Sequence, residues 1–264
     1  MRKILTFVFA LTALCVSARY VTETDIPYTK NGDEYSKERC RLDVYHDPEQ
    51  KNLPVVVWFH GGGLTGGNKY LPEQLQNSGY VLIAPNYRLI PNVGVDDCID
   101  DAAQAVVWAF ENAERFGGDP SKIFVTGHSA GGYLTSMVGL DRSRLAKYGV
   151  EADSIAGLIP YSGQVITHFA PRRERGMSEL QPLIDETAPL YHVRRDAPPY
   201  IIITGDRELE LFGRYEENAY MWRMMKLNGH PDVRIYELDG YNHGDMPHGA
   251  HHILKNEIKR LLGQ

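Results

Sequence analysis

The chain has 264 residues, of which 43% are hydrophobic and 23% are charged, and its formal net charge is -6. These values are typical of a globular protein and exclude a disordered, fibrous or membrane-embedded chain. The negative charge argues against a nucleic-acid partner, because nucleic acids attract basic surfaces. A single domain of this length can bury a core without disulfides or a metal.

The amino-terminal segment has the pattern of a targeting signal. Two basic residues precede an apolar run over 4–16, and Val16-Ser17-Ala18 supplies the small residues that a signal peptidase reads. We therefore expect a signal peptide over 1–18 and an exported, secreted or periplasmic mature domain over 19–264. The apolar run is short for a bilayer, and no later stretch reaches the length of a transmembrane helix, so no stable membrane span is expected.

Two cysteines, Cys40 and Cys98, remain in the predicted mature chain. Export would allow them to pair, and the sequence leaves open whether they come within reach of each other. Two free, buried cysteines are the favoured interpretation. Neither lies in a motif of a thiol nucleophile.

Apolar and amphipathic runs alternate along the chain, which indicates an α/β fold with a mostly parallel central sheet flanked by helices. Residues 41–45 alternate and predict an early antiparallel edge strand. Further strands are predicted at 54–59, 80–84, 123–126, 155–159, 200–204 and 233–238. Helices are predicted at 96–116, 131–139, 215–227 and 250–262.

The segment 161–199 is irregular, because five prolines interrupt any periodicity. A connection of this length in a compact domain is typical of a functional loop or a small lid. We expect it to form the roof of a substrate pocket. Its Arg172, Arg173 and Arg175 are interpreted as a solvated charged surface, with recognition of an acidic sugar as the alternative.

Gly127-His128-Ser129-Ala130-Gly131 fits the pattern G-x-S-x-G between a predicted buried strand and a predicted helix. The sharp turn of this motif needs residues almost without side chains two positions before and after the serine. Gly127 and Gly131 satisfy that need. The following helix points its positive end at Ser129, and the N–H of Ala130 is free to donate to an oxyanion.

His60-Gly61-Gly62-Gly63 follows an earlier apolar strand. Its glycines let backbone N–H groups approach a developing negative oxygen without a Cβ in the way. A phosphate-binding loop is not supported, because no Lys-Ser/Thr pair follows the tract.

Five motifs together resemble the carboxylesterases of the hormone-sensitive-lipase and kynurenine-formamidase-like branches of the α/β-hydrolases. They are His60-Gly61-Gly62-Gly63, Asn86-Tyr87-Arg88-Leu89, Phe116-Gly117-Gly118-Asp119-Pro120, Gly127-His128-Ser129-Ala130-Gly131-Gly132 and Tyr241-Asn242-His243-Gly244. The resemblance implies an α/β-hydrolase fold with Ser129 as nucleophile, His243 as base, and Gly62, Gly63 and Ala130 as oxyanion donors.

The base is expected in a loop after the last strand of this fold, and His243 follows the strand 233–238. His60 and His128 flank the site and are expected to stabilise its loops. Residues His248, His251 and His252 fall in or beside the final helix and are expected to face solvent. No thiol or carboxylate cluster accompanies them, so no metal site is predicted.

The acidic member of the triad is expected just after the strand 200–204. In many relatives it lies three residues after a glycine that ends the strand, and counting from Gly205 reaches Glu208. Asp206 is the alternative, because some relatives have a shorter spacing and Asp is the commoner residue type. Glu210 is a third candidate.

These residues predict a serine carboxylic-ester hydrolase that acts through an acyl-enzyme on short-acyl or carbohydrate-linked esters, such as acetyl or feruloyl esters. No cofactor is expected, and the partner is a small-molecule ester, with an acylated sugar as one option. An amidase, formamidase or peptidase on the same machinery is the alternative, and a non-catalytic binding protein is a further one. The acyl group, the alcohol and the oligomeric state stay open.

Overall fold

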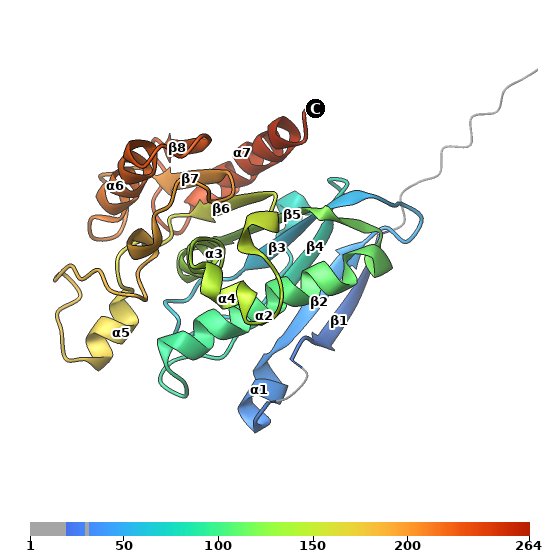
Figure 1. The fold of residues 1–264 in the computed structure, drawn as a ribbon, viewed down its shortest axis with the longest axis horizontal. Coiled ribbons are helices and arrows are strands. Elements are labelled where there is room, and N and C mark those ends of the chain that lie inside the picture. The colour runs from blue at the N-terminus through green and yellow to red at the C-terminus, as the bar shows by residue number, and fades with distance from the viewer. Residues whose placement is uncertain (1–19, 30–31) are drawn as a thin grey trace, which may run out of the picture.

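A twisted sheet runs through the centre of the molecule in the computed structural model, which describes residues 20–29 and 32–264 (Figure 1). The predicted signal peptide lies outside the described residues. Within them the sheet has eight strands in the order β1-β2-β4-β3-β5-β6-β7-β8. The strands are β1 (Val21–Pro27), β2 (Arg41–His46), β3 (Leu53–Phe59), β4 (Val81–Pro85), β5 (Gly118–His128), β6 (Gly157–Tyr161), β7 (Tyr200–Gly205) and β8 (Val233–Leu238).

The strands β3 to β8 are parallel to one another, whereas β2 pairs antiparallel with both β1 and β4. This is the predicted, mostly parallel sheet. The prediction of an edge strand at 41–45 is wrong in one respect, because β1 covers the outer side of β2. β1 has no apolar pattern that would predict it, since most of its residues are exposed.

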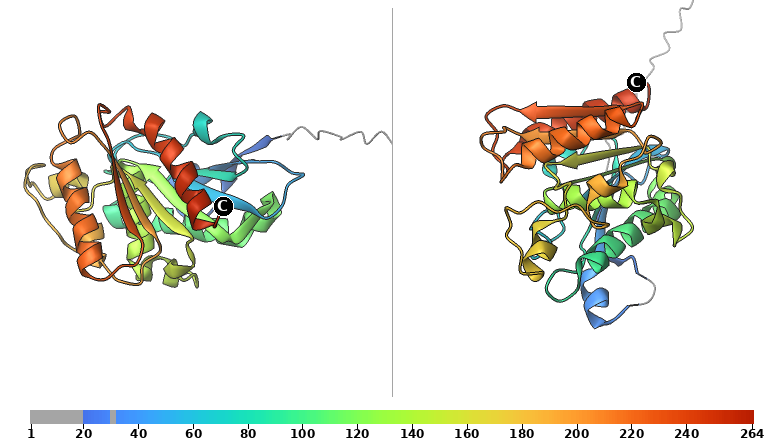
Figure 2. Two further views of the ribbon diagram at one scale, coloured as in Figure 1. Left: turned by 90° about the horizontal axis from the view of Figure 1, so that it is seen from above. Right: turned by 60° about the vertical axis from the view of Figure 1, so that its left-hand side comes forward.

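Helices cover both faces of the sheet, as the turned views in Figure 2 show. The residues of α2, α3 and α6 pack into one apolar core, and those of α7 pack into a second core on the opposite face. The helices are α1 (Glu34–Arg39), α2 (Val95–Asn112), α3 (Ala130–Leu140), α4 (Arg142–Ala146), α5 (Phe169–Glu174), α6 (Arg214–Leu227) and α7 (Met246–Leu261). Short 3-10 segments are η1 (Glu73–Leu75), η2 (Ala113–Phe116), η3 (Ala152–Ser154) and η4 (Pro189–His192).

Cys40 and Cys98 are both buried and free, which confirms the favoured interpretation. Within the described ranges, none of the helices combines the length and the apolar character needed to cross a membrane.

The irregular segment 161–199 contains only α5 and η4 between β6 and β7. Figure 1 shows α5 and its loops projecting from the sheet on the same side as the start of α6. The last residues of β3, β5, β7 and β8 end at one edge, because these strands are parallel. The loops after them therefore meet there, as ligand-binding loops do in open α/β sheets.

Candidate active site

Ser129 occupies a sharp turn between β5 and α3. Its backbone angles are φ 58° and ψ -115°, a conformation that L-residues rarely adopt. A Cβ at Gly131 would collide with the carbonyl of Phe59, and one at Gly127 would come within 2.6 Å of that same oxygen. The two glycines are therefore required for the close packing of the turn against β3, as predicted from the motif.

The side chain of His243 reaches this turn from the loop between β8 and α7. Its Nε2 lies 2.9 Å from the Ser129 Oγ. The N–H of Ser129 itself donates to the Tyr161 carbonyl at 2.8 Å, so it does not face a substrate. The structure brings together the two residues that the sequence predicted as nucleophile and base.

The carboxylate that contacts His243 belongs to Glu210. Its Oε2 lies 2.7 Å from the His243 Nδ1. The prediction of Glu208, and the alternative of Asp206, are corrected by this geometry. Glu208 is exposed on the turn, and among the described residues no side-chain hydrogen bond joins it to the histidine.

Asp206 is used to build the turn rather than the triad. Its carboxylate accepts from the N–H groups of Glu208 at 2.9 Å and Gly240 at 2.8 Å. The backbone then folds back, with the Glu210 N–H donating to the Asp206 carbonyl at 2.9 Å. Because of this extra turn, the acid comes five residues after Gly205 instead of three. The sequence offered Glu210 only as a third candidate, and no local spacing distinguished it.

Glu210 is held from three sides. Besides His243, its Oε1 accepts from the Gly205 N–H at 3.0 Å and from the Ser162 hydroxyl. Only 1% of its side chain is exposed. Burial favours the neutral acid, but the hydrogen bonds and charge of His243 together with those two donors lower the pKa of Glu210 to about 2. It is therefore a carboxylate at neutral pH. Ser162 was not predicted, since an isolated serine carries no motif.

The glycine loop after β3 lies beside the serine. A Cβ at Gly61 would be 3.4 Å from the Ser129 Cβ. Gly62 and Gly63 have φ values of 117° and 64°, and the Gly62 carbonyl closes the loop by accepting from the Gly66 N–H at 3.0 Å.

The three predicted oxyanion donors have N–H groups without backbone acceptors. None of the hydrogen bonds of the described chain uses the N–H of Gly62 or Gly63. Ala130 is the first residue of α3, where an N–H has no acceptor within the helix. All three are thus available to a ligand.

The sequence is similar to known ester hydrolases. The family BD-FAE matches residues 42–156. The probable carboxylic ester hydrolase LipM of Mycobacterium tuberculosis is 28% identical over 74% of this chain and 50% of its own length. Esterase LipC of the same organism is 27% identical over 88% of this chain and 62% of its own length. The chain thus spans half to about three-fifths of these curated relatives.

Solved structures show the same fold. A truncated carbohydrate esterase from gut microbiota superposes with a TM-score of 0.75 at 17% identity, covering 92% of this chain and 97% of the other. Esterase 2 of Thermogutta terrifontis, phosphoramylated by tabun, gives a TM-score of 0.71 at 23% identity, covering 92% and 95%. The chain has the α/β-hydrolase fold. Its resemblance to carboxylesterases, which the motifs indicated, is confirmed.

Two histidines stabilise the loops around the site. His128 donates its Nε2–H to the His243 carbonyl at 2.8 Å, and burial lowers its pKa to about 3, so it is neutral. His60 stacks on Tyr87 with ring centroids 4.3 Å apart, and burial lowers its pKa to about 4. Within the described chain, the histidine that is hydrogen-bonded to the Ser129 hydroxyl is His243.

His251 corrects another expectation, because it is buried rather than facing solvent. It lies on the inner side of α7, with its ring 5.2 Å from that of Trp58 and its Nδ1 3.3 Å from the Tyr161 hydroxyl. Burial lowers the pKa of His251 to about 4. His248 and His252 are exposed, as predicted. In the part of the chain that the structure describes, no group of His, Cys, Asp or Glu side chains could hold a metal ion.

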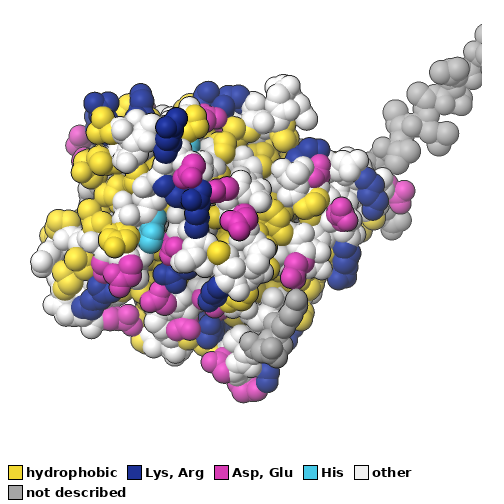
Figure 3. Space-filling model, in the orientation of Figure 1, with side chains coloured by type: hydrophobic (Ala, Val, Ile, Leu, Met, Phe, Trp, Pro, Cys, Tyr) yellow, Lys and Arg dark blue, Asp and Glu magenta, His cyan; other side chains and the backbone are white. Residues whose placement is uncertain are grey.

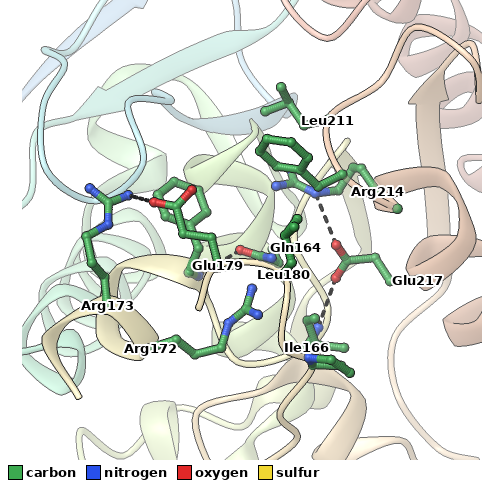
Figure 4. Close-up of a pocket in the computed structure, with 13 residues that line it drawn as sticks. Gln164, Ile166, Arg172, Arg173, Glu179, Leu180, Leu211, Arg214 and Glu217 are labelled. Atoms are coloured by element: carbon green, nitrogen blue, oxygen red, sulfur yellow. Dashed lines mark hydrogen bonds and ion pairs between the residues drawn. The ribbon is translucent and has the colours of Figure 1, made fainter. Parts of the chain in front are cut away.

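A cavity of about 580 Å³ lies between the segment after β6 and the start of α6 (Figure 4). Its walls come from 164–182, within the predicted lid-like segment, and from 211–217. Phe169 in its wall lies so near the glycine loop that a Cβ at Gly63 would be 2.9 Å from its ring. Leu211, on the other side, directly follows Glu210. Phe169 and Leu211 therefore connect the cavity wall to the oxyanion loop and to the acid.

Proposed function

We propose that this α/β-hydrolase is a serine carboxylic-ester hydrolase that acts through an acyl-enzyme. The observation that carries the proposal is the continuous hydrogen-bonded path from the Ser129 Oγ through His243 to Glu210, with distances of 2.9 and 2.7 Å. A serine, an imidazole and a buried carboxylate in this order form the machinery of nucleophilic acyl transfer.

In the first step His243 takes the hydroxyl proton on Nε2 as the Ser129 Oγ attacks the ester carbonyl. The positive imidazole that forms is stabilised by the Glu210 carboxylate, which also fixes the tautomer with a proton on Nδ1. The N–H groups of Gly62, Gly63 and Ala130 stabilise the negative oxygen of the tetrahedral intermediate.

Protonated His243 then gives its proton to the leaving alcohol, and the acyl group stays on Ser129. A water molecule repeats the sequence, with His243 again as base, and releases the acid and the free serine. The mechanism uses groups of the chain and water alone.

Esters with a short acyl group or a carbohydrate alcohol, such as acetyl or feruloyl esters, are the proposed substrates. The similarity to a carbohydrate esterase supports a sugar-linked ester. The cavity of about 580 Å³ falls in the size range of pockets for small molecules and supports an acyl or alcohol portion larger than acetyl. In this proposal the segment 161–199 forms the roof of the substrate pocket.

The test is turnover of para-nitrophenyl acetate by the wild type, Ser129→Ala and Ser121→Ala. The matched control, Ser121, is exposed near the opposite end of β5. We expect Ser129→Ala to lose several powers of ten in kcat and Ser121→Ala to keep wild-type turnover. A folded Ser129→Ala protein with most of the activity would contradict the proposal. A panel of acetylated and feruloylated sugars, short-chain esters and formyl amides then ranks the substrates and separates ester from amide hydrolysis.

We also propose that the protein is exported, on the basis of the basic and apolar residues that precede Val16-Ser17-Ala18. Expression in a secreting host should yield a mature protein that begins at Arg19 by intact mass. A cell-associated protein that keeps residues 1–18 would contradict this.

A further inference from the structure

The cavity beside the active site combines apolar walls with buried charge. Figure 3 shows hydrophobic side chains gathered on the side of the molecule where Figure 1 places α5 and the start of α6. Among the residues lining the cavity, Leu180 and Phe212 are 69% and 72% exposed, so they form an open apolar rim.

Arg172 is the buried charge, so its interpretation as solvated surface was wrong. It lies on α5, lines the cavity, and is only 1% exposed. Figure 4 shows its guanidinium extending from α5 toward Gln164 and Ile166. One nitrogen, Nη1, donates to the Gln181 carbonyl, and the buried Nε has no hydrogen-bond partner.

The other charged groups around Arg172 already have partners. Arg173 pairs with Glu179 at 2.5 Å, and Arg214 pairs with Glu217 at 3.3 Å. Glu217 also accepts from the N–H groups of 165 and 166, at 2.9 and 3.1 Å. In the described chain no carboxylate oxygen lies within ion-pair distance of the Arg172 guanidinium.

A buried guanidinium without a carboxylate in contact is unfavourable, because five N–H donors and a full positive charge have left water. Glu217 and Glu179 act on Arg172 only at longer range, and each already pairs with another arginine. The surroundings of Arg172 supply one carbonyl acceptor. A ligand that enters the cavity with an anionic oxygen group would supply a contacting charge and the missing acceptors, and guanidinium matches a carboxylate with paired hydrogen bonds.

We propose that the cavity binds an ester substrate that carries a carboxylate, and that Arg172 recognises this carboxylate while the apolar rim holds the chain or ring that joins it to the scissile bond. The proposal rests on the proposed ester hydrolysis and names its substrate class. The carboxylate belongs to the acyl or to the alcohol portion, and the two arms of the test separate these cases.

The test compares kcat/KM for matched pairs of esters. The acyl arm uses mono-para-nitrophenyl adipate against para-nitrophenyl hexanoate, and the alcohol arm uses para-acetoxybenzoate against para-acetoxybenzamide. We expect the wild type to prefer the anionic ester in one arm. Arg172→Met should lower the anionic-to-neutral ratio roughly ten- to a hundred-fold, the range of a hydrogen bond between charged groups.

Two comparisons keep the result specific. Arg175 directly follows α5 and does not line the cavity. Arg175→Gln should therefore keep the wild-type ratio of kcat/KM for the anionic and neutral esters. Leu180→Asp places a carboxylate at the exposed rim and should lower the ratio relative to Leu180→Asn, which has the same shape. Because Leu180 is exposed, its two variants should fold. They therefore test carboxylate binding in the cavity even if Arg172→Met does not fold.

A wild-type preference for the neutral ester in both arms would overturn the inference. So would ratios that respond neither to Arg172→Met nor to Leu180→Asp. If one of these results is found while the neutral esters are still hydrolysed in a Ser129-dependent way, the proposed function stands and only the carboxylate subsite is ruled out. Absence of Ser129-dependent hydrolysis of every ester would instead remove the proposed function.

Discussion

Glu210 Oε2 lies 2.7 Å from His243 Nδ1, although the two residues are 33 positions apart in the sequence. The contact forms because the turns after β7 and β8 meet at the same edge of the sheet, where the Asp206 N–H donates to the Tyr241 carbonyl at 2.8 Å. Glu210 is thereby the group that fixes the tautomer of His243.

Glu210→Gln should lower kcat by about 10³- to 10⁴-fold, because an amide cannot stabilise the positive imidazole and can favour the wrong tautomer. Glu208→Gln should keep wild-type kcat, since its side chain is exposed and apart from His243. Steady-state kinetics on a short ester compare the two. A severe loss confined to Glu208→Gln would reverse the assignment.

Ser162→Ala tests how Glu210 is positioned. Loss of the hydroxyl that donates to Oε1 should reduce the free energy of unfolding by about 1 to 2 kcal/mol and raise the pKa of Glu210 from about 2. Because the carboxylate stays ionised at neutral pH, kcat should fall much less than in Glu210→Gln. The readout is the pH profile of kcat, whose acid limb should move to higher pH. An unchanged acid limb would assign Ser162 a purely structural role.

Gly131→Ala tests the packing of the turn around Ser129. The new methyl group would collide with the Phe59 carbonyl, so we expect a loss of a few kcal/mol in unfolding free energy or failure to fold. The control is Gly94→Ala, where the nearest atom to an added Cβ is 3.9 Å away. Urea unfolding measures both. Equal stability of the two variants would contradict the close packing.

His251 should make the fold sensitive to acid. It is neutral in the folded chain, with a pKa of about 4, whereas an unfolded histidine has a pKa of about 6.5. Between these two pH values the unfolded state binds more protons than the folded state. The free energy of unfolding is therefore unaffected by His251 above pH 6.5, and it falls as the pH decreases toward 4.

Through His251, the free energy of unfolding should decrease by about 2 to 3 kcal/mol between pH 7 and pH 4.5. In His251→Gln the decrease between these two pH values should be smaller by that amount. In His252→Gln, a change at an exposed position, the decrease should be the same as in the wild type. Urea unfolding at the two pH values gives the comparison. An identical pH dependence in His251→Gln and the wild type would show that the histidine titrates normally.

The sequence predicted most of the sheet and the reacting pair, because both depend on local signals. The apolar runs of β3 to β7 are buried, as runs in a sheet covered on both faces should be. The glycines around Ser129 are required by the sharp turn at that residue. β1 was missed because its exposed residues lack an apolar pattern.

The acid and the buried His251 were placed wrongly because they depend on tertiary geometry. The number of residues in the turn that brings Glu210 back toward Gly205 is set by backbone bonds to Asp206, which no spacing rule predicts. His251 is buried because Trp58 and Tyr161 lie beneath α7, and helical periodicity alone does not identify that neighbour.

The most direct test of the proposed mechanism is covalent labelling of the nucleophile by an organophosphate ester such as diethyl para-nitrophenyl phosphate, read by intact mass and peptide mapping. The account predicts one adduct per chain, on the peptide that contains Ser129, and none on Ser129→Ala. Absence of an adduct on the folded wild type, or an adduct that persists in Ser129→Ala, would contradict the assignment of Ser129 as the nucleophile.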